Sequence, residues 1–323
     1  MKRRDFLLLT AGAGIAPVGF SPTMAAVDYP AKPVRVMVGF PANGPVDIAG
    51  RVISEWLTER LGQHFAVENK PGESGNTATR EVVRAAADGY TLLIFGPVNT
   101  INTTLFGDLD FDFGRDILPI AGLYRVPLVV EVNPSVPVNS AADLLTYARQ
   151  NPGKLKVGYG GKGTPQHIGI ELFKWMAKVD MKLMAFTGSA PALQALQAGE
   201  VDVMFDPLPS SIGLIRDNKL RPLAVTTPVR SPVLPDIPSM SEHVPGYEAG
   251  SWFGLGAPRE TPVEVVAKLD AAVGEGLAAT KIRLRIESLG GTPLLLSQRK
   301  LAQFVTAETE RFSLVIKAAG IGR

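Results

Sequence analysis

The 323-residue chain contains no cysteine. This absence excludes disulfides, zinc sites built from thiolates, and enzymes that rely on a thiol nucleophile. Histidine is also scarce: His64, His167 and His243 are widely separated, and no two of them have the spacing that places two metal ligands on one helix face. We therefore expect no metal site.

Motifs of catalysis and of nucleotide binding are missing as well. No Gly-x-Ser-x-Gly elbow occurs, and the run Gly160–Thr164 lacks the spacing of a phosphate-binding P-loop. No Gly-x-Gly-x-x-Gly follows the first expected strand. These absences predict a protein without a catalytic constellation and without a cofactor.

Excess charge and long apolar runs are absent from most of the chain. The formal net charge is +2, and Lys2, Arg3, Arg4 and Asp5 account for it, so the remainder is neutral. Such a balance gives no reason to expect a nucleic-acid partner. Beyond residue 26 no stretch is apolar for long enough to span a bilayer, so we expect no insertion into the membrane.

The first 26 residues have the pattern of a cleavable export signal. Three basic residues precede an apolar run from Phe6 to Phe20, and small residues follow as far as Ala26. We predict a signal peptide over residues 1–26, cleavage after Ala25 or Ala26, and a mature protein in the bacterial periplasm. The pair Arg3-Arg4 fits a twin-arginine signal, but adjacent arginines also occur in ordinary Sec signals, so both export routes stay open.

Residues 34–61 predict a strand, a tight turn and an amphipathic helix. The segment Val34–Phe40 is nearly all apolar, as is typical of a strand covered on both faces. Asn43, Gly44 and Pro45 then indicate the start of a helix. Because the first N–H groups of a helix have no partner within it, this turn suits an anion without any basic side chain.

The same order of strand, glycine-bearing turn and helix continues along the chain, with further strands expected at 65–69, 91–95, 156–159, 182–186, 202–205 and 251–257. Residues 96–102 and 206–210 read as loops, and residues 117–132 as apolar extended segments broken by Pro119 and Pro127 that lead into a second domain. Alternating elements of this kind predict an α/β fold with doubly wound, parallel-rich sheets. We expect residues 220–226 to return the chain to the first domain.

Loops at the carboxyl ends of parallel strands meet at one edge of a sheet, so these polar loops are expected to converge on a crevice. Every α/β fold needs turns of this type, however, and composition alone favours the purely structural interpretation by roughly two to one. Asp47 is an example, since an acidic residue in a first helical turn is commonly explained by the helix dipole. His167 either lines a site or makes a local contact at a helix end.

Several segments, taken together and in order, resemble one known family. They are YPAKPVRVMVGFPANGPVDIAGR, VENKPGESGN, ADGYTLL, GGKGTPQHIGIELF, FTGSAPALQAL, GEVDVMFDPLPSS, LRPLAVTTPVRSPVLPDIPSM and PGYEAGSWFGLGAP. From about Tyr29 to the C-terminus the chain is similar to the solute-binding proteins of tripartite tricarboxylate transporters, the Bug family.

The resemblance implies a periplasmic receptor of Venus-flytrap type, similar to type II periplasmic binding proteins, with a ligand held between two domains. It implies domain 1 over residues 27–126 and 227–323, and domain 2 over residues 127–226. It further implies a small organic or aromatic carboxylate as ligand, membrane permease subunits as partners, and a monomer. The ligand would shift the population toward the closed form, because only in that form do both domains contact the ligand.

Some family motifs are altered in this chain. Asn43-Gly44 stands where two glycines are usual, the segment 159–164 reads YGGKGT, and Phe186-Thr187-Gly188 replaces a Tyr-Lys-Gly run. Asp206-Pro207 replaces an Asp-Asn pair. Tyr159 then offers a stacking face and Lys162 a charge, although a solvated lysine explains Lys162 better. These changes predict a cleft that is less polar than is usual in the family.

The expected ligand-binding residues come from the strand-to-helix loops of both domains. They are Phe40, Asn43, Gly44, Pro45, Val46, Asp47, Ser74, Asn76, Val98, Asn99, Tyr159, Lys162, Gly163, Thr164, His167, Thr187, Gly188, Ser189, Ala190 and Asp206. We expect one carboxylate near Gly44–Val46 and a second polar group near residues 163–164 and 189–190. Two alternatives remain at this point: an exported α/β enzyme that uses His167 or Asp206 as acid or base, and a ligand sensor of a signalling system.

Overall fold

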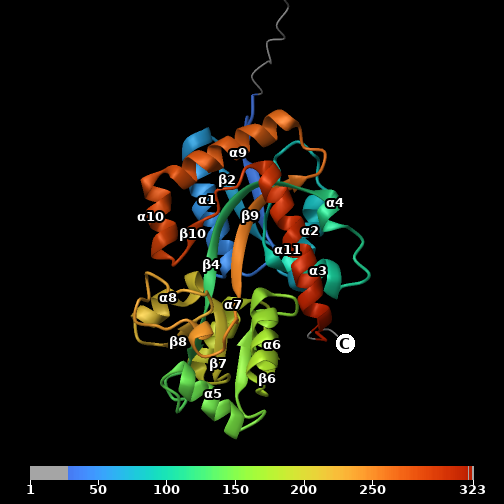
Figure 1. Ribbon diagram of the computed structural model, residues 1–323. Helices are drawn as coiled ribbons and strands as arrows, with labels where there is room; N and C mark the ends of the chain where they lie inside the picture. Colours follow the sequence, from blue (N-terminus) through green and yellow to red (C-terminus); the bar gives the residue numbers. More distant parts are fainter. Residues whose placement is uncertain (1–27, 319, 322–323) are drawn as a thin grey trace, which may run out of the picture.

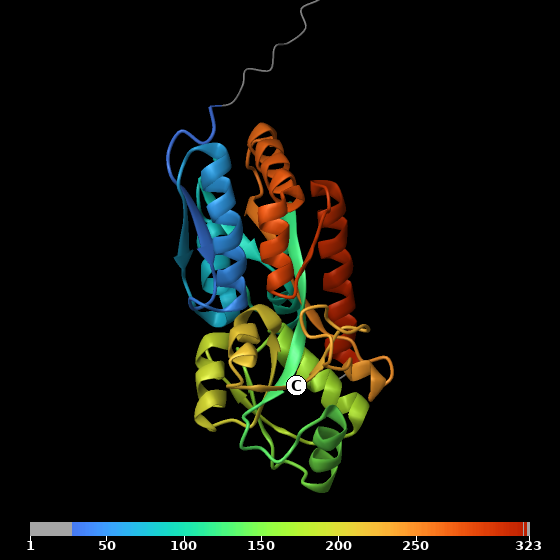
Figure 2. The ribbon, with the colours of Figure 1, turned by 90° about the vertical axis from the view of Figure 1, so that its left-hand side faces the viewer.

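One long strand, β4 (Ile117–Val132), joins the two lobes of this computed structural model, which describes residues 28–318, 320 and 321 (Figure 1). Residues 117–127 pair with β9 (Gly250–Pro258), and residues 128–132 pair with β7 (Val203–Pro207). A view turned by 90° also shows β4 passing from one lobe into the other (Figure 2). The expected signal peptide of residues 1–26 lies outside the described residues.

The expectation that prolines break the segment 117–132 is wrong. Pro119 lies where the register between β4 and β9 shifts, and Pro127 lies where the partner of β4 changes from β9 to β7. Because each proline falls at an irregularity of the ladder, its missing N–H interrupts no regular run of hydrogen bonds. The strand therefore continues through both positions.

The sheet is mixed, with parallel pairs at its outer strands and antiparallel pairs at its centre. Its order is β2-β1-β3-β9-β4-β7-β5-β6, and β8 and β10 pair with β4 beside this path. The prediction of an α/β fold is confirmed, but the expectation of parallel-rich sheets is wrong around β4 and β9, whose pairs are all antiparallel. Antiparallel neighbours need no crossover helix between them. The strand β4 can therefore pair with β9 in one lobe and with β7 and β8 in the other.

The first lobe has helices on both faces of its strands. Helices α1, α9 and α10 share one core cluster, and α2, α4 and α11 share another. Its remaining elements are β1 (Val34–Val38), α1 (Pro45–Leu61), β2 (Phe65–Asn69), α2 (Asn76–Val83), β3 (Thr91–Phe95), α3 (Pro97–Leu105), α4 (Phe113–Asp116), α9 (Val263–Ala278), α10 (Thr280–Ser288), β10 (Thr292–Pro293) and α11 (Gln298–Ala318), with a 3-10 turn at Glu73–Gly75.

The second lobe is built in the same way. Helices α5 and α6 pack on one face of its strands, and α7 and α8 pack on the other. Its remaining elements are α5 (Ala141–Gln150), β5 (Lys156–Tyr159), α6 (Pro165–Ala177), β6 (Lys182–Ala185), α7 (Ser189–Ala198), α8 (Leu208–Arg216) and β8 (Arg221–Val225), with a 3-10 turn at Met240–Glu242. No helix among the described residues combines the length and apolarity needed to cross a membrane.

The segment expected to be a polar loop at residues 96–102 is helix α3, so that expectation is wrong. Its buried asparagines find hydrogen-bond partners inside the protein: Asn99 accepts from the Gly96 N–H and donates to Thr79, and the Asn102 amide group donates to the Ser74 carbonyl and to Asn76. Polar residues that find such partners do not need solvent. The polar composition of residues 96–102 therefore indicated a loop, although the segment forms a helix.

Two further boundaries differ from expectation. Asp206 and Pro207 belong to β7, where they pair with Val129 and Leu128, rather than to a loop. Strand β8 pairs with the last residues of β4 and stays in the second lobe. Met240, Val244 and Tyr247 also belong to a core cluster of the second lobe, so the chain returns to the first lobe only at β9.

The turn between β1 and α1 is fixed by the buried carboxylate of Asp47. It accepts hydrogen bonds from the Asn43 N–H, Arg51 and Asn69, each at 2.9 Å, and Asn69 also donates to the Phe40 carbonyl. Asn43 adopts a left-handed conformation with φ of 65°, and Gly44, not Asn43, is the helix cap. Burial opposes ionisation of Asp47, but these hydrogen bonds outweigh it and hold its pKa below the ordinary value.

We expect Asp47→Ala to lower the free energy of unfolding by about 2 kcal/mol, because it leaves the Asn43 N–H and the Asn69 amide without their acceptor. Arg51→Ala should cost less than about 1 kcal/mol, since the Arg51 side chain is 56% exposed. Because the pKa of Asp47 is depressed, its contribution is present above the ordinary pKa of about 4 and is lost as the pH falls through the folded value. Urea unfolding at pH 7 and pH 3 measures both effects, and equal losses in the two variants would contradict this account.

Candidate functional site

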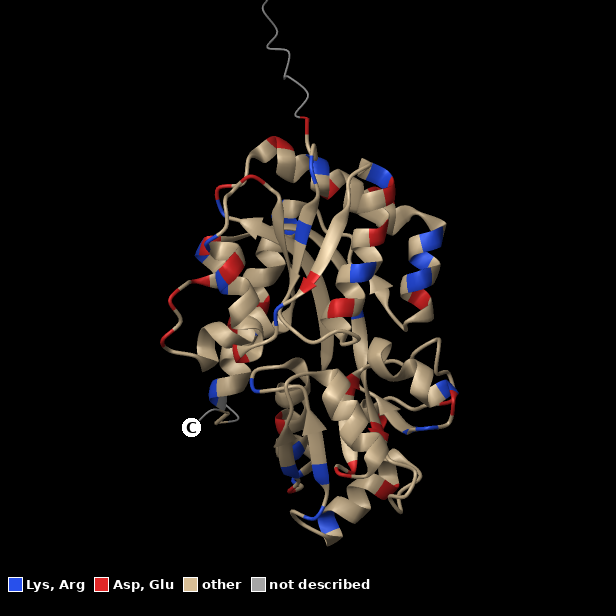
Figure 3. Ribbon diagram, turned by 180° about the vertical axis from the view of Figure 1, so that it is seen from behind, with Lys and Arg blue, Asp and Glu red and all other residues tan. Residues whose placement is uncertain are grey.

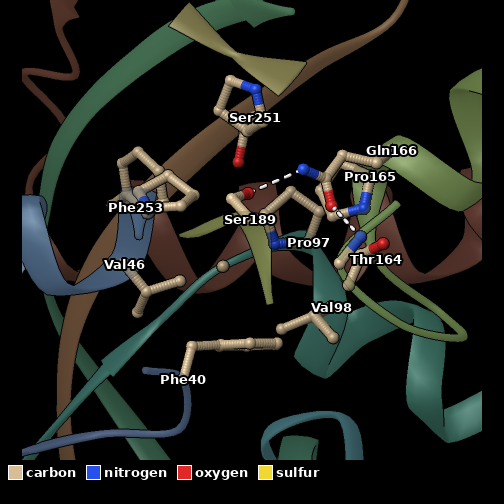
Figure 4. Close-up of a pocket in the computed structure, with 14 residues that line it drawn as sticks. Phe40, Val46, Pro97, Val98, Thr164, Pro165, Gln166, Ser189, Ser251 and Phe253 are labelled. Atoms are coloured by element: carbon tan, nitrogen blue, oxygen red, sulfur yellow. Dashed lines mark hydrogen bonds between the residues drawn. The ribbon is translucent and has the colours of Figure 1, made fainter. Parts of the chain in front are cut away.

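A narrow cavity lies where the two lobes meet. Segments of both lobes contribute to it, and Figure 4 shows their side chains converging on a common space. Its lining residues are Phe40, Pro45, Val46, Gly96, Pro97, Val98, Gly160, Thr164, Pro165, Gln166, Ser189, Pro207, Ser251 and Phe253.

Prolines mark the starts of four helices at this cavity. Pro45, Pro97 and Pro165 occupy the first turns of α1, α3 and α6, and Pro207 directly precedes α8. Proline is tolerated there because the first N–H groups of a helix have no partner within the helix. Each ring removes one N–H donor and adds apolar surface, so the helix starts contribute less to anion binding than the sequence predicts.

One side of the cavity is apolar. Phe40, Val46 and Val98 lie together on that side (Figure 4), and Phe253 adds a second aromatic ring. Phe40 is held close to the backbone of Gly75, since a Cβ placed on Gly75 would lie 3.1 Å from the ring. This side suits a hydrocarbon or aromatic group.

The opposite side carries the polar groups, which we call the polar corner: Gln166, Ser189 and Ser251. Gln166 accepts the Gly160 N–H at 2.8 Å and donates to Ser189 Oγ at 2.7 Å and to Asp206 Oδ1 at 2.5 Å. Its amide orientation is therefore fixed and both of its N–H groups are used. The hydroxyl of Ser251, with the N–H of Gln166 in α6 and the first-turn N–H groups of α7, remains as a donor for a ligand.

Among the residues that the structure describes, no charged side chain lines the cavity. Basic and acidic residues are interspersed along the ribbons of both lobes (Figure 3). Within the described residues, no group of three or more His, Asp or Glu side chains has a geometry that would hold a metal ion. The electrostatic character of the site thus comes from helix starts and hydroxyls.

His167 lies behind the cavity wall. Its ring stacks on Tyr159 with 5.1 Å between centroids, and its Nδ1 accepts the Gly163 N–H at 3.3 Å. Burial, followed by the nearby charges of Lys162 and Lys174, lowers its pKa to about 4. The imidazole is therefore neutral at pH 7 and supports the loop that carries Thr164.

The predicted site residues fall into three groups. Six of them line the cavity: Phe40, Pro45, Val46, Val98, Thr164 and Ser189. Two of them, Ser74 and Thr187, line an adjoining space that shares Phe40 and Gly160 with the cavity. Asn99 lines a smaller space beside Val98. The others line neither the cavity nor these two spaces: Asn43, Gly44, Asp47, Asn76, Tyr159, Lys162, Gly163, His167, Gly188, Ala190 and Asp206.

Eight lining residues were not predicted. Five of them are immediate sequence neighbours of predicted residues: Pro97, Gly160, Pro165, Gln166 and Pro207. Gly96 and Gly160 belong to loops that were expected to converge. Ser251 and Phe253 come from β9, and no local pattern distinguishes them, because only the pairing of β9 with β3 and β4 brings them to the cavity.

Three glycines of the second lobe lie against the first lobe. A Cβ placed on Gly163 would lie 2.5 Å from Asn102 Oδ1, one on Gly188 would lie 2.8 Å from Pro41 Cδ, and one on Gly161 would lie 3.8 Å from Ser74 Oγ. Contacts at 2.5 Å and 2.8 Å leave no room for a methyl group. Gly163 and Gly188 therefore permit this close approach of the lobes.

We expect Gly188→Ala to keep the lobes farther apart than in the wild type. The φ of Gly188 is 161°, an extended conformation that alanine adopts without strain, so the added methyl group acts mainly through Pro41. Gly213→Ala is the matched control in the same lobe, because a Cβ there meets no atom within 4 Å. Small-angle X-ray scattering should give a larger radius of gyration for the Gly188 variant alone, and identical scattering from both variants would refute the role of this contact.

Comparison with known proteins agrees with the two-lobed architecture. A family model described as the tripartite tricarboxylate transporter family receptor matches residues 49–321. The structure of Rpa4515 from R. palustris with adipate has a TM-score of 0.89 at 39% identity, covering 91% of this chain and 99% of that one. MatC (Rpa3494) from Rhodopseudomonas palustris, with bound malate, has a TM-score of 0.84 at 32% identity, covering 89% and 100%.

Among curated sequences, Protein BugT of Bordetella pertussis is 29% identical over 318 residues, which cover 97% of this chain and 97% of that protein. The family match spans most of the described residues and includes α1 from residue 49 onward, β4, the polar corner and β9. The fold is thus that of the type II-like periplasmic binding proteins. The chain belongs to the receptors of the tripartite tricarboxylate transporter family, the group that includes the Bug proteins.

Proposed function

We propose that this protein is a periplasmic solute-binding receptor that captures a small carboxylate between its lobes and delivers it to the membrane subunits of a tripartite transporter. The observation that carries the proposal is the cavity between the lobes, with hydroxyls and helix starts on one side and apolar side chains on the other. A carboxylate with a hydrocarbon or aromatic body has the matching division of polarity. Membership of the receptor family supports the same conclusion.

The arrangement of the cavity suggests how the ligand is oriented. Its carboxylate accepts hydrogen bonds at the polar corner, and its body packs against Phe40, Val46 and Val98. Relatives were solved with adipate and with malate. Adipate has four methylene groups between its carboxylates whereas malate is short and hydroxylated, so the apolar side of this cavity favours acids of the adipate kind and aromatic acids.

Closure of the two lobes accompanies binding in this proposal. We assign domain 1 to residues 27–126 and 250–323, and domain 2 to residues 127–249, because residues 240–247 pack in the second lobe. This moves one boundary from residue 226 to residue 249. Only the closed form brings Val46 and Ser189 to the same ligand, so the ligand shifts the population toward closure by its differential affinity for the two forms.

We also propose that the protein binds its ligand without converting it, acts as a monomer and reaches the periplasm through its N-terminal signal. Neither His167 nor Asp206, the two candidates for an acid or base, lines the cavity. The family description names a transporter receptor, which favours transport over sensing as its role.

Isothermal titration with protein freed of co-purified ligand tests the proposal. We expect adipate, hexanoate and benzoate to bind, and malate to bind more weakly, because malate places a hydroxyl against apolar side chains. Absence of binding for every acid would refute the carboxylate assignment. Tighter binding of malate than of adipate would refute the orientation given above.

Val46→Ala should weaken the binding of adipate about tenfold, since it removes two methyl groups worth about 0.8 kcal/mol each from the apolar side. Val229→Ala is the control, because Val229 is 73% exposed and does not line the cavity. The dissociation constants of both variants follow from the same titration. Equal dissociation constants for the two variants would show that the ligand body does not pack against Val46.

A further inference from the structure

Two carboxyl groups, Glu131 on β4 and Asp206 on β7, are wholly buried directly behind the polar corner. The register pairs Val129 with Asp206 and Glu131 with Met204. Both carboxyls therefore project from the same face of the sheet on diagonally adjacent positions, within reach of each other. That face is covered by α7 and α8.

In the part of the chain that the structure describes, no basic group compensates this pair. No ion pair joins either carboxyl to a lysine, arginine or histidine within the described residues. The hydroxyls of Ser189 and Ser210 face Asp206, and that of Ser211 faces Glu131. Even so, both oxygens of Glu131 and Oδ2 of Asp206 lack a hydrogen-bond partner among the described residues.

The packed elements hold few other titratable groups, and each is directed elsewhere. Helix α7 has none, and the single one of α8, Arg216, donates to the Ser288 carbonyl. Arg221 of β8 donates to carbonyls of residues 134–138, and Lys156 of β5 is exposed. On α6, His167 stacks on Tyr159, and Glu171 pairs with Lys174. The remaining cation of β4, Arg125, lies in the part of the strand paired with β9.

Two neighbouring buried carboxyls without a cation cannot both ionise readily, so the pair retains at least one proton. Burial raises the pKa of Asp206 to about 7. Burial, and then the charge of Asp206, raises the pKa of Glu131 well above its ordinary value. Near neutral pH the pair thus carries between zero and one negative charge.

Only one hydrogen bond separates this pair from the cavity, because Gln166 lines the cavity and donates to Asp206 Oδ1. We infer that binding of a carboxylate at the polar corner is coupled to uptake of one proton by the Glu131–Asp206 pair. This inference rests on the proposed function. The proton comes from solvent, adds to a carboxylate oxygen and removes the negative charge that repels the ligand.

Protonation need not alter the shape of the site. Oδ2 of Asp206 has no hydrogen-bond partner among the described residues, whereas Oδ1 accepts from Gln166. A proton on Oδ2 therefore leaves the Gln166 hydrogen bond, and with it the orientation of the amide, unchanged. The coupling acts through charge, and its signature is a pH-dependent affinity.

Titration of the wild type with adipate and with hexanoate, in phosphate and in Tris at equal pH, measures the number of protons taken up. We expect net uptake between pH 7 and 8, none near pH 5.5, and an affinity that falls by up to about tenfold per pH unit above pH 7. Asp206→Asn should abolish the uptake and flatten the pH dependence. Asp217→Asn, a change to an exposed carboxylate at the end of α8, should retain both.

Binding without proton uptake, or uptake that persists in Asp206→Asn, would overturn the inference and leave the proposed function intact. Failure of every acid to bind would overturn both. If Asp206→Asn does not fold, the infrared difference spectrum of the wild type with hexanoate at pH 7.5 decides. A gain of the protonated carboxyl band in the complex supports the coupling, and its absence refutes it.

Discussion

The hydrogen bonds of β4 are the constraint on which the rest of this structure depends. The strand β4 pairs with β9 along its first part and with β7 and β8 within its last five residues. The two lobes therefore share a continuous ladder. Because backbone groups in such a ladder cannot lose their partners without cost, the lobes stay joined at one junction along β4. That junction gathers the starts of α1, α3, α6, α7 and α8 around one cavity.

The cavity combines two tendencies that oppose each other. Helix starts favour an anion, whereas the prolines that occupy or precede four of them remove donors and add apolar surface. The outcome is a site with one polar corner, built from hydroxyls and from a glutamine whose orientation is fixed. Selectivity in such a site comes from the shape and polarity of the ligand rather than from its number of charges.

The sequence predicts the local parts of this site and fails where distant segments meet. The β1–α1 turn, Phe40, Val46, Thr164 and Ser189 follow from strand-to-helix patterns, because their positions depend on neighbours in the chain. Helix α3 was missed because its asparagines look like loop residues until their buried partners are known. Ser251 and Phe253 reach the cavity only through strand pairing, and Gln166 gains its role from Asp206, 40 residues away.

Helix α11 adds a kinetic property to this architecture. Its Phe312 and Ile316 form one buried cluster with Ile101 of α3 and Ile168 of α6, so apolar side chains of both lobes pack together outside the cavity lining. Separation of the lobes must part or slide these side chains. The rate at which a bound molecule leaves is then bounded by the rate of this rearrangement. Acids of quite different affinity would share that upper limit on their dissociation rates.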